Sequence, residues 1–145
     1  MTKWIIFILL LLAVGYFVAQ KAFMPTNKTL AIGYYTQIQI EIADNLAKQV
    51  QGLSGRDSLC ENCGMLFVYA NPQILRFWMK DMKFPLDIIF IKDQKVSEIF
   101  EYVPVPQPGK EIPWVQSSEY TNAVLEVNAG FVSTNRIKIS DPVSY

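Results

Sequence analysis

Residues 74–80, Ile-Leu-Arg-Phe-Trp-Met-Lys, decide how this chain is expected to fold. The apolar side chains at positions 75, 77 and 79 alternate with those at positions 74, 76, 78 and 80, which is the period of a strand with two different faces. One face is apolar and is expected to enter the core. The other face places Trp78 between the cations Arg76 and Lys80, which packing alone does not explain.

Short strands separated by turn residues are predicted along most of the remaining chain. Residues 37–42 alternate isoleucine with polar side chains, and residues 86–91 are nearly all apolar, as in a strand covered on both faces. A last strand is expected at residues 136–139. One sizeable helix is predicted to begin at Asp44 as its N-cap and to end at Gly52.

Residues 103–114 break this pattern, because prolines at 104, 106, 108 and 113 exclude a central strand and predict a long surface loop. The fold class is therefore mainly β: a single compact, sandwich-like or barrel-like domain with one short helix, preceded by one N-terminal transmembrane helix. We expect the domain at residues 37–145 and a linker at residues 24–36.

The N-terminal segment is predicted to be a membrane anchor. Residues 4–19 carry no charged side chain, and a helix of this run spans about 24 Å at about 1.5 Å per residue. Residues 20–23 extend it if Lys21 reaches the lipid headgroups. We expect residues 1–23 to be uncleaved and the domain to lie on the extracytoplasmic side; a cleaved signal peptide is the alternative. Lysines flank both ends, so the positive-inside rule gives this orientation little support.

Composition excludes several kinds of site. The chain has 145 residues, 51% of them hydrophobic, and a net charge of +0, so no electrostatic field draws it to nucleic acid, and no nucleic-acid partner is expected. There is no histidine, which removes Ser-His-Asp and Cys-His catalysis and every histidine-ligated metal. We predict no cofactor and no metal site.

Four separated blocks resemble one known family. They are residues 52–59, similar to the family's Gly-Leu-Met-x-Arg-x-x-Leu segment; residues 64–68; residues 77–90, with Phe-Trp-Met-Lys and Pro-Leu-Asp-Ile-Ile-Phe; and residues 124–130, Val-Leu-Glu-Val-Asn-Ala-Gly. On these blocks the chain is identified as a member of the domain-of-unknown-function family 192, although it has Asp81-Met82 where the family usually has Asn-Thr. The resemblance implies a compact mainly-β domain of the sandwich type, often behind a signal or anchor. It implies no activity.

Cys60 and Cys63 are not part of that family pattern. In an oxidising compartment they are expected to form a local disulfide before the strand that starts near Gly64. The alternatives are a redox pair or half of a metal site shared by two chains. A thioredoxin-like pair needs a helix N-terminus to lower the thiol pKa, and a zinc site needs four ligands, so both alternatives are the weaker interpretations.

Six residues are candidates for a ligand site. Trp78 offers an aromatic stacking platform, and Glu126 shares a strand face with Asn128, where buried polar groups need partners. A hydrogen-bonded network that only fixes the fold is the alternative. The candidates are Arg56, Trp78, Lys80, Asp87, Glu126 and Asn128.

The leading functional hypothesis is a domain tethered to a membrane by its N-terminal helix that binds a small polar ligand or a cell-envelope component. One alternative is a histidine-free hydrolase, with Asp87 or Glu126 as general acid or base against Lys80 or Arg56. The other is a protein-interaction module in which the proline-rich loop and Trp114 meet a partner. The sequence leaves the oligomeric state open.

Overall fold

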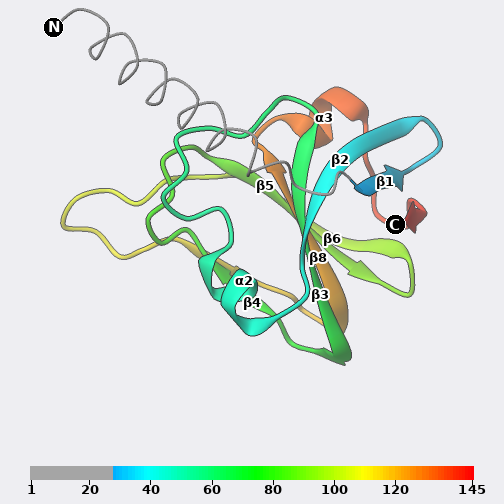
Figure 1. The fold of residues 1–145 in the computed structure, drawn as a ribbon, viewed down its shortest axis with the longest axis horizontal. Helices are drawn as coiled ribbons and strands as arrows, with labels where there is room; N and C mark the ends of the chain where they lie inside the picture. The colour runs from blue at the N-terminus through cyan, green and yellow to red at the C-terminus, as the bar shows by residue number, and fades with distance from the viewer. Residues whose placement is uncertain (1–27) are drawn as a thin grey trace, which may run out of the picture.

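The computed structural model describes residues 28–145, which form a seven-stranded sheet and a separate two-stranded ribbon (Figure 1). The strand order in the sheet is β6-β5-β8-β3-β2-β1-β9, and β4 pairs with β7 in the ribbon. In chain order the elements are β1 (Lys28–Ile32), β2 (Thr36–Ala43), α2 (Leu46–Gln51), β3 (Cys63–Gln73), β4 (Arg76–Trp78), β5 (Leu86–Lys92), β6 (Lys95–Val103), β7 (Trp114–Gln116), β8 (Thr121–Asn128), α3 (Phe131–Asn135) and β9 (Val143–Ser144).

One parallel pair sets the topology of the sheet. β2 and β3 run parallel, whereas the other neighbouring strands of the described residues run antiparallel. A hairpin cannot join a parallel pair, so the chain crosses over through α2 and residues 52–62. Asn45 caps α2 by accepting a hydrogen bond from the Lys48 amide, and the helix ends at Gly52, whose φ is 50°. The crossover places Gly52 over one face of the sheet.

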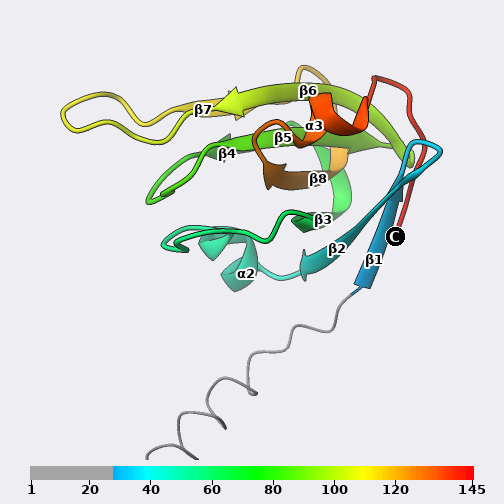
Figure 2. The same ribbon diagram turned by 90° about the horizontal axis from the view of Figure 1, so that it is seen from above.

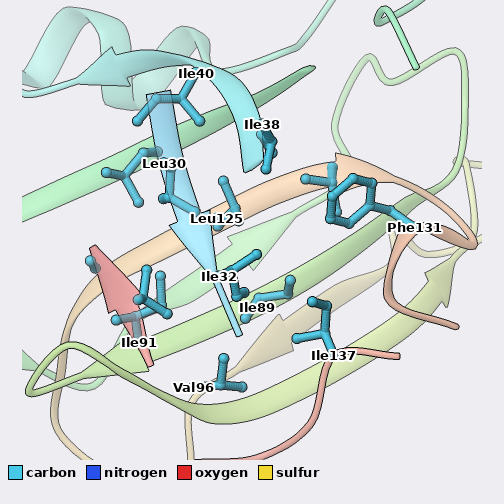
Figure 3. Close-up of a cluster of buried hydrophobic side chains, with 14 of the residues drawn as sticks. Leu30, Ile32, Ile38, Ile40, Ile89, Ile91, Val96, Leu125, Phe131 and Ile137 are labelled. Atoms are coloured by element: carbon cyan, nitrogen blue, oxygen red, sulfur yellow. The ribbon is translucent and has the colours of Figure 1, made fainter. Parts of the chain in front are cut away.

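The sheet curls into a half-barrel, which is clearest from above (Figure 2). The segment before β9 joins its two ends: the Val96 amide of β6 donates to the Asp141 carbonyl, and the Gly33 amide beside β1 donates to the Pro142 carbonyl. The first core lies inside this curve (Figure 3). Its buried members include Leu30, Ile32, Ile38, Ile40, Leu66, Ile89, Ile91, Val96, Leu125, Phe131 and Ile137.

A second core covers the opposite face of the sheet. β3 sends Met65 and Phe67 to this face and Leu66 to the inner one, as the period of two in a strand requires. Phe77 of the ribbon meets Phe67 edge-on, with ring centroids 4.8 Å apart. Burying such a ring stabilises the fold by about 1.5–3 kcal/mol, so the β4–β7 ribbon is fixed on this face mainly by Phe77 and its apolar neighbours.

The structure confirms the mainly-β class and the two-faced character of residues 74–80. Positions 75, 77 and 79 are buried, while positions 76, 78 and 80 are exposed. β5 is buried along six of its seven residues, as expected of a strand covered on both faces. Residues 104–113 form the expected loop between β6 and β7.

Several boundaries differ from the prediction. Residues 28–32, expected within a linker, form β1, because Leu30 and Ile32 both enter the inner core. No strand forms at 136–139: Arg136 and Ser140 both have positive φ, and Ile137 alone turns inward while Ile139 stays exposed. The N-cap of α2 is Asn45 rather than Asp44.

The expected N-terminal anchor, residues 1–23, lies outside the described residues. Between residues 28 and 145 no helix is long and apolar enough to cross a membrane.

Candidate functional site

Glu126 is a buried carboxyl group in the middle of the sheet. It lies on β8 between Met65 of β3 and Ile88 of β5, and only 5% of the residue is exposed. Among the hydrogen bonds of residues 28–145, none reaches its carboxyl oxygens. Burial raises the pKa of Glu126 to about 8, and the positive charge of Arg56 opposes this rise without cancelling it. A buried polar group without a protein partner calls for an explanation.

A small cavity of about 60 Å³ opens over Glu126. This is room for about two water molecules or one small polar group. Gly52 forms part of the wall, and a β-carbon there would lie 3.4 Å from the Phe67 Cζ and 4.0 Å from the Glu126 Oε2. The positive φ of Gly52 further disfavours a side chain at this position. The lining residues are Gln49, Val50, Gln51, Gly52, Leu53, Ser54, Phe67, Tyr69, Arg76, Phe77, Trp78, Met82 and Glu126.

Arg56 lies near this cavity but already has a partner. Its Nη1 and Nη2 donate to the two carboxylate oxygens of Glu41 at 2.5 and 2.8 Å, and both side chains are about three-quarters buried. Hydrogen bonding to Arg56 holds the pKa of Glu41 below its usual value, against the opposing effect of burial. The guanidinium therefore neutralises Glu41 rather than Glu126, which leaves Glu126 without a bonded counter-ion.

The outer face of the β4–β7 ribbon carries two aromatic–cation contacts. Trp78 and Trp114 are cross-strand partners, both about half exposed. The Arg76 guanidinium stacks over Trp114 at 4.3 Å, and the Lys80 ammonium lies over Trp78 at 5.4 Å from the ring centroid. Trp78 and Arg76 also line the Glu126 cavity, so this aromatic face forms part of the cavity wall.

Asp87 has a different environment from Glu126. It is fully buried, and its two oxygens accept the amides of Tyr102 and Val132, each at 2.9 Å. Its cross-strand partner is Val127, which belongs to the inner core, whereas Glu126 lies beside residues of the outer core. Asp87 therefore fixes the end of β6 and the start of α3 from the other side of the sheet.

Asn128 shares the strand face of Glu126 but holds the cysteine loop. Its side-chain amide donates to the carbonyls of Leu59 and Cys60 at 3.2 and 3.0 Å. Cys60 and Cys63 are joined by a disulfide with a Cα–Cα distance of 5.2 Å. The loop thus depends on two constraints, one covalent and one hydrogen-bonded.

The proline-rich loop borders a second and larger hollow. Residues 99–104 at the end of β6 and residues 111–115 leading into β7 line an open groove of about 620 Å³. Its walls include the exposed side chains of Tyr102, Ile112 and Trp114 and the acidic Glu101 and Glu111. This groove lies outside the walls of the Glu126 cavity, since the two share no lining residue.

The structure brings together part of the predicted site. Glu126 and Trp78 line one cavity, Arg56 lies close enough to influence the charge of Glu126, and Lys80 lies over Trp78. Asp87 and Asn128 do not line that cavity. Sequence reasoning missed Tyr69, whose pKa is raised by burial and by Glu126. It also missed Gly52 as a wall, although its place at a helix end was visible in the sequence.

No group of three or more acidic or cysteine side chains that could hold a metal ion occurs between residues 28 and 145.

These features define a mainly-β half-barrel domain with a small acidic cavity on its outer face. The chain belongs to the DUF192 family, described as "Uncharacterized ACR", whose model matches residues 28–145. A search of the curated proteins gives no match.

Two solved structures are similar along most of the chain. A protein of unknown function from Novosphingobium aromaticivorans DSM 12444 is 31% identical, with a TM-score of 0.73, covering 82% of this chain and 85% of that one. A protein titled "putative transcription regulator" from Sinorhizobium meliloti 1021 is 25% identical, with a TM-score of 0.71, covering 83% of this chain and 96% of that one.

Proposed function

We propose that this domain binds a small polar ligand in the cavity over Glu126, and that residues 1–23 tether it to a membrane on the extracytoplasmic side. The observation that carries the binding proposal is the unpaired Glu126 carboxyl facing the cavity. Leaving a buried carboxyl without a partner costs on the order of 1–3 kcal/mol, so a purely structural role would favour an apolar residue. A ligand that bonds this group offsets that cost.

The surroundings of Glu126 support binding more directly than hydrolysis. A two-carboxylate hydrolase needs both groups on the substrate, but Asp87 faces the other side of the sheet and is bonded to two backbone amides. The cavity is also small, so only the end of a ligand enters it, while the rest lies against the exposed ring of Trp78. This arrangement suits recognition of a polar end group.

The proposed location rests on two observations. The Cys60–Cys63 disulfide is typical of oxidising compartments outside the cytoplasm. The uncharged run at residues 4–19 has the composition of a membrane segment.

Carbonate extraction of membranes tests the membrane tether, and protease treatment of intact cells tests the extracytoplasmic location. We expect the full chain to stay with the membrane and to be cleaved from outside; a chain extracted by carbonate or protected from protease contradicts the proposal.

Ligand retention tests the binding proposal. The full chain, Glu126→Gln and Glu61→Gln are purified in parallel, and native mass spectrometry compares the small molecules that remain bound. Glu61 is an exposed glutamate that lines neither hollow, so its variant makes the same chemical change elsewhere. We expect a bound compound in the wild type and in Glu61→Gln, and loss of that compound in Glu126→Gln. Equal retention by all three contradicts a site at Glu126.

Peptide binding in the groove beside the proline-rich loop is a second candidate function. No strand pairing joins β6 and β7 in residues 28–145, although the Glu98 carboxylate accepts the Ser118 amide where they approach. The groove between them has free strand edges and the acidic Glu101 and Glu111, which suit an extended basic peptide added as a strand. An octapeptide of alternating lysine and threonine should quench tryptophan fluorescence, and Trp114→Ala should remove that signal. No quenching in the wild type rejects this role.

A further inference from the structure

Three polar side chains of the Glu126 cavity wall, Gln49, Gln51 and Ser54, donate hydrogen bonds to backbone carbonyls. Gln49 Nε2 donates to the carbonyls of Ala43 and Val68. Gln51 Nε2 donates to the Ser54 carbonyl, and the Ser54 hydroxyl donates to the Lys80 carbonyl. The oxygens of these three side chains remain as acceptors, in addition to the two unbonded oxygens of Glu126. These three side chains therefore add acceptor oxygens to the wall, while Tyr69 and Arg76 add donors.

We propose that the ligand enters this cavity with a primary ammonium group, which donates to Glu126 and to the neighbouring acceptor oxygens. This inference rests on the proposed function and names the chemical class of the ligand. An ammonium has three donors and no acceptor, which complements such a wall, and it is small enough for about 60 Å³. A carboxylate or phosphate group beside Glu126 would instead meet these acceptor oxygens, and its donors would have to come from Tyr69, Arg76 or a protonated Glu126.

The aromatic side chains that line the cavity also favour an ammonium group. Phe67, Tyr69, Phe77 and Trp78 all border the cavity, and the faces of aromatic rings attract cations. No protein cation is bonded to Glu126 within residues 28–145, because Arg56, whose charge acts on this carboxyl, already forms a two-point pair with Glu41. An ionised Glu126 is thus free to pair with the ligand.

The positive charge of Arg76 determines which charge the outer end of the ligand can carry. Its guanidinium borders the cavity, donates to the Gln116 Oε1 at 3.1 Å and stacks over Trp114, and no carboxylate pairs with it within residues 28–145. A second cation at this point would be repelled, whereas an anionic group would be attracted. The best match is a compound with an ammonium at one end and a carboxylate at the other.

Binding of an ammonium should release a proton from Glu126. The charged and titratable groups around the carboxyl are Arg56 from the crossover, Tyr69 from β3 and Arg76 from β4, and burial keeps the empty site largely protonated at pH 7. Pairing with a cation favours the ionised carboxylate. A ligand that only accepts a hydrogen bond keeps the proton on Glu126, so the two kinds of ligand differ in proton release.

The test uses a matched pair of probes on the full chain: 4-aminobutanoate and 4-hydroxybutanoate, which differ only in the group that enters the cavity. Isothermal titration calorimetry at pH 7 in two buffers of different ionisation enthalpy gives both affinity and proton release. We expect the amine to bind at least about tenfold more tightly, the scale of one charged hydrogen bond, with net proton release. Glu126→Gln should remove this preference and the proton release, and Glu61→Gln, at an exposed position outside both hollows, should keep both.

Methyl glucoside, a neutral probe, separates the proposal of a binding site at Glu126 from the inference that the ligand carries an ammonium group. If the hydroxyl compound or the glucoside binds at least as well as the amine, and Glu126→Gln weakens that binding, the ammonium inference is overturned while the proposed site stands. If none of the probes binds the wild type, or Glu126→Gln binds them equally, both the inference and the proposed function are contradicted.

Discussion

Asp87 and Glu126 lie on paired strands one register position apart, yet their carboxyl groups face opposite sides of the sheet. Asp87 pairs with Val127 and accepts two backbone amides in the inner core, while Glu126 pairs with Ile88 and faces the outer cavity without a hydrogen bond from residues 28–145. Asp87 is therefore held by backbone amides, whereas Glu126 faces a cavity and has no bonded partner among the described residues.

Replacing Glu126 with glutamine should change how stability depends on pH. The carboxyl has a pKa of about 8 when folded and 4.5 by its ordinary value, so between these values the folded state holds a proton that the unfolded state has lost. Wild-type stability therefore falls as the pH rises from 4.5 to 8 and is constant above 8, with a slope of up to about 1.4 kcal/mol per pH unit.

Urea unfolding at pH 5 and pH 8 measures this effect. We expect Glu126→Gln to match the wild type at pH 5 and to exceed it at pH 8 by on the order of a few kcal/mol. Glu111→Gln, at an exposed position, should follow the wild type at both values. The same pH dependence in the wild type and in Glu126→Gln would show that Glu126 is ionised in the fold.

Replacing Asp87 with asparagine should destabilise the fold without affecting the cavity. An asparagine keeps one acceptor oxygen and turns an amide toward a buried backbone N–H, so one of the bonds to Tyr102 and Val132 is lost. We expect a cost of about 1.5–3 kcal/mol in urea unfolding. Asp57→Asn, at an exposed salt bridge, is the control and should leave the unfolding midpoint unchanged. Loss of ligand with unchanged stability in Asp87→Asn would place Asp87 in the binding site.

Glu41→Gln should show that Arg56 stabilises the fold through its ion pair with Glu41. The folded pKa of Glu41 is lowered, so its pair with Arg56 contributes above pH 4.5 and that contribution is lost as the pH falls through the lowered value. Because the pair is partly screened by solvent, we expect a loss of roughly 1 kcal/mol at pH 7. The loss should vanish near pH 3. A deficit that persists at pH 3 would point to packing rather than charge.

Removing the disulfide should have a modest effect on stability. The loop it closes is short, so the chain-entropy contribution is about 1–2 kcal/mol. Asn128 also holds the loop through the carbonyls of Leu59 and Cys60. Thermal unfolding of the double variant Cys60→Ser, Cys63→Ser should therefore show a cooperative transition at a slightly lower temperature. A non-cooperative transition would show that the loop organises the whole domain.

Much of the fold could be predicted because strand periodicity is local. Alternation in residues 74–80 reports which side chains enter the core, and the apolar run of β5 reports burial on both faces. The short strand β1 was missed because only two of its residues, Leu30 and Ile32, point inward, and two residues are too few to show an alternating pattern. The parallel pairing of β2 with β3 depends on contacts between distant residues, which periodicity does not report.

The site was only partly predictable for the same reason. Trp78 stood out because it shares a strand face with two cations, and Glu126 stood out because a glutamate within an apolar strand needs a partner. Which face of the sheet Asp87 occupies depends on the register between β5 and β8. The other residues of β5 are nearly all apolar, so no alternation along the strand indicates that face. The partner of Arg56 is Glu41, fifteen residues earlier on β2, and only the crossover through α2 brings the two together.

The most direct test of the account is the titration of the Glu126 side chain itself. With the full chain labelled with carbon-13 at glutamate carboxyl carbons, and Glu126→Gln used to assign the signal, NMR follows its shift from pH 3 to pH 10. The account predicts a midpoint near 8, set by burial without a bonded partner. A midpoint between about 4 and 5, the range of an ordinary glutamate, would contradict it.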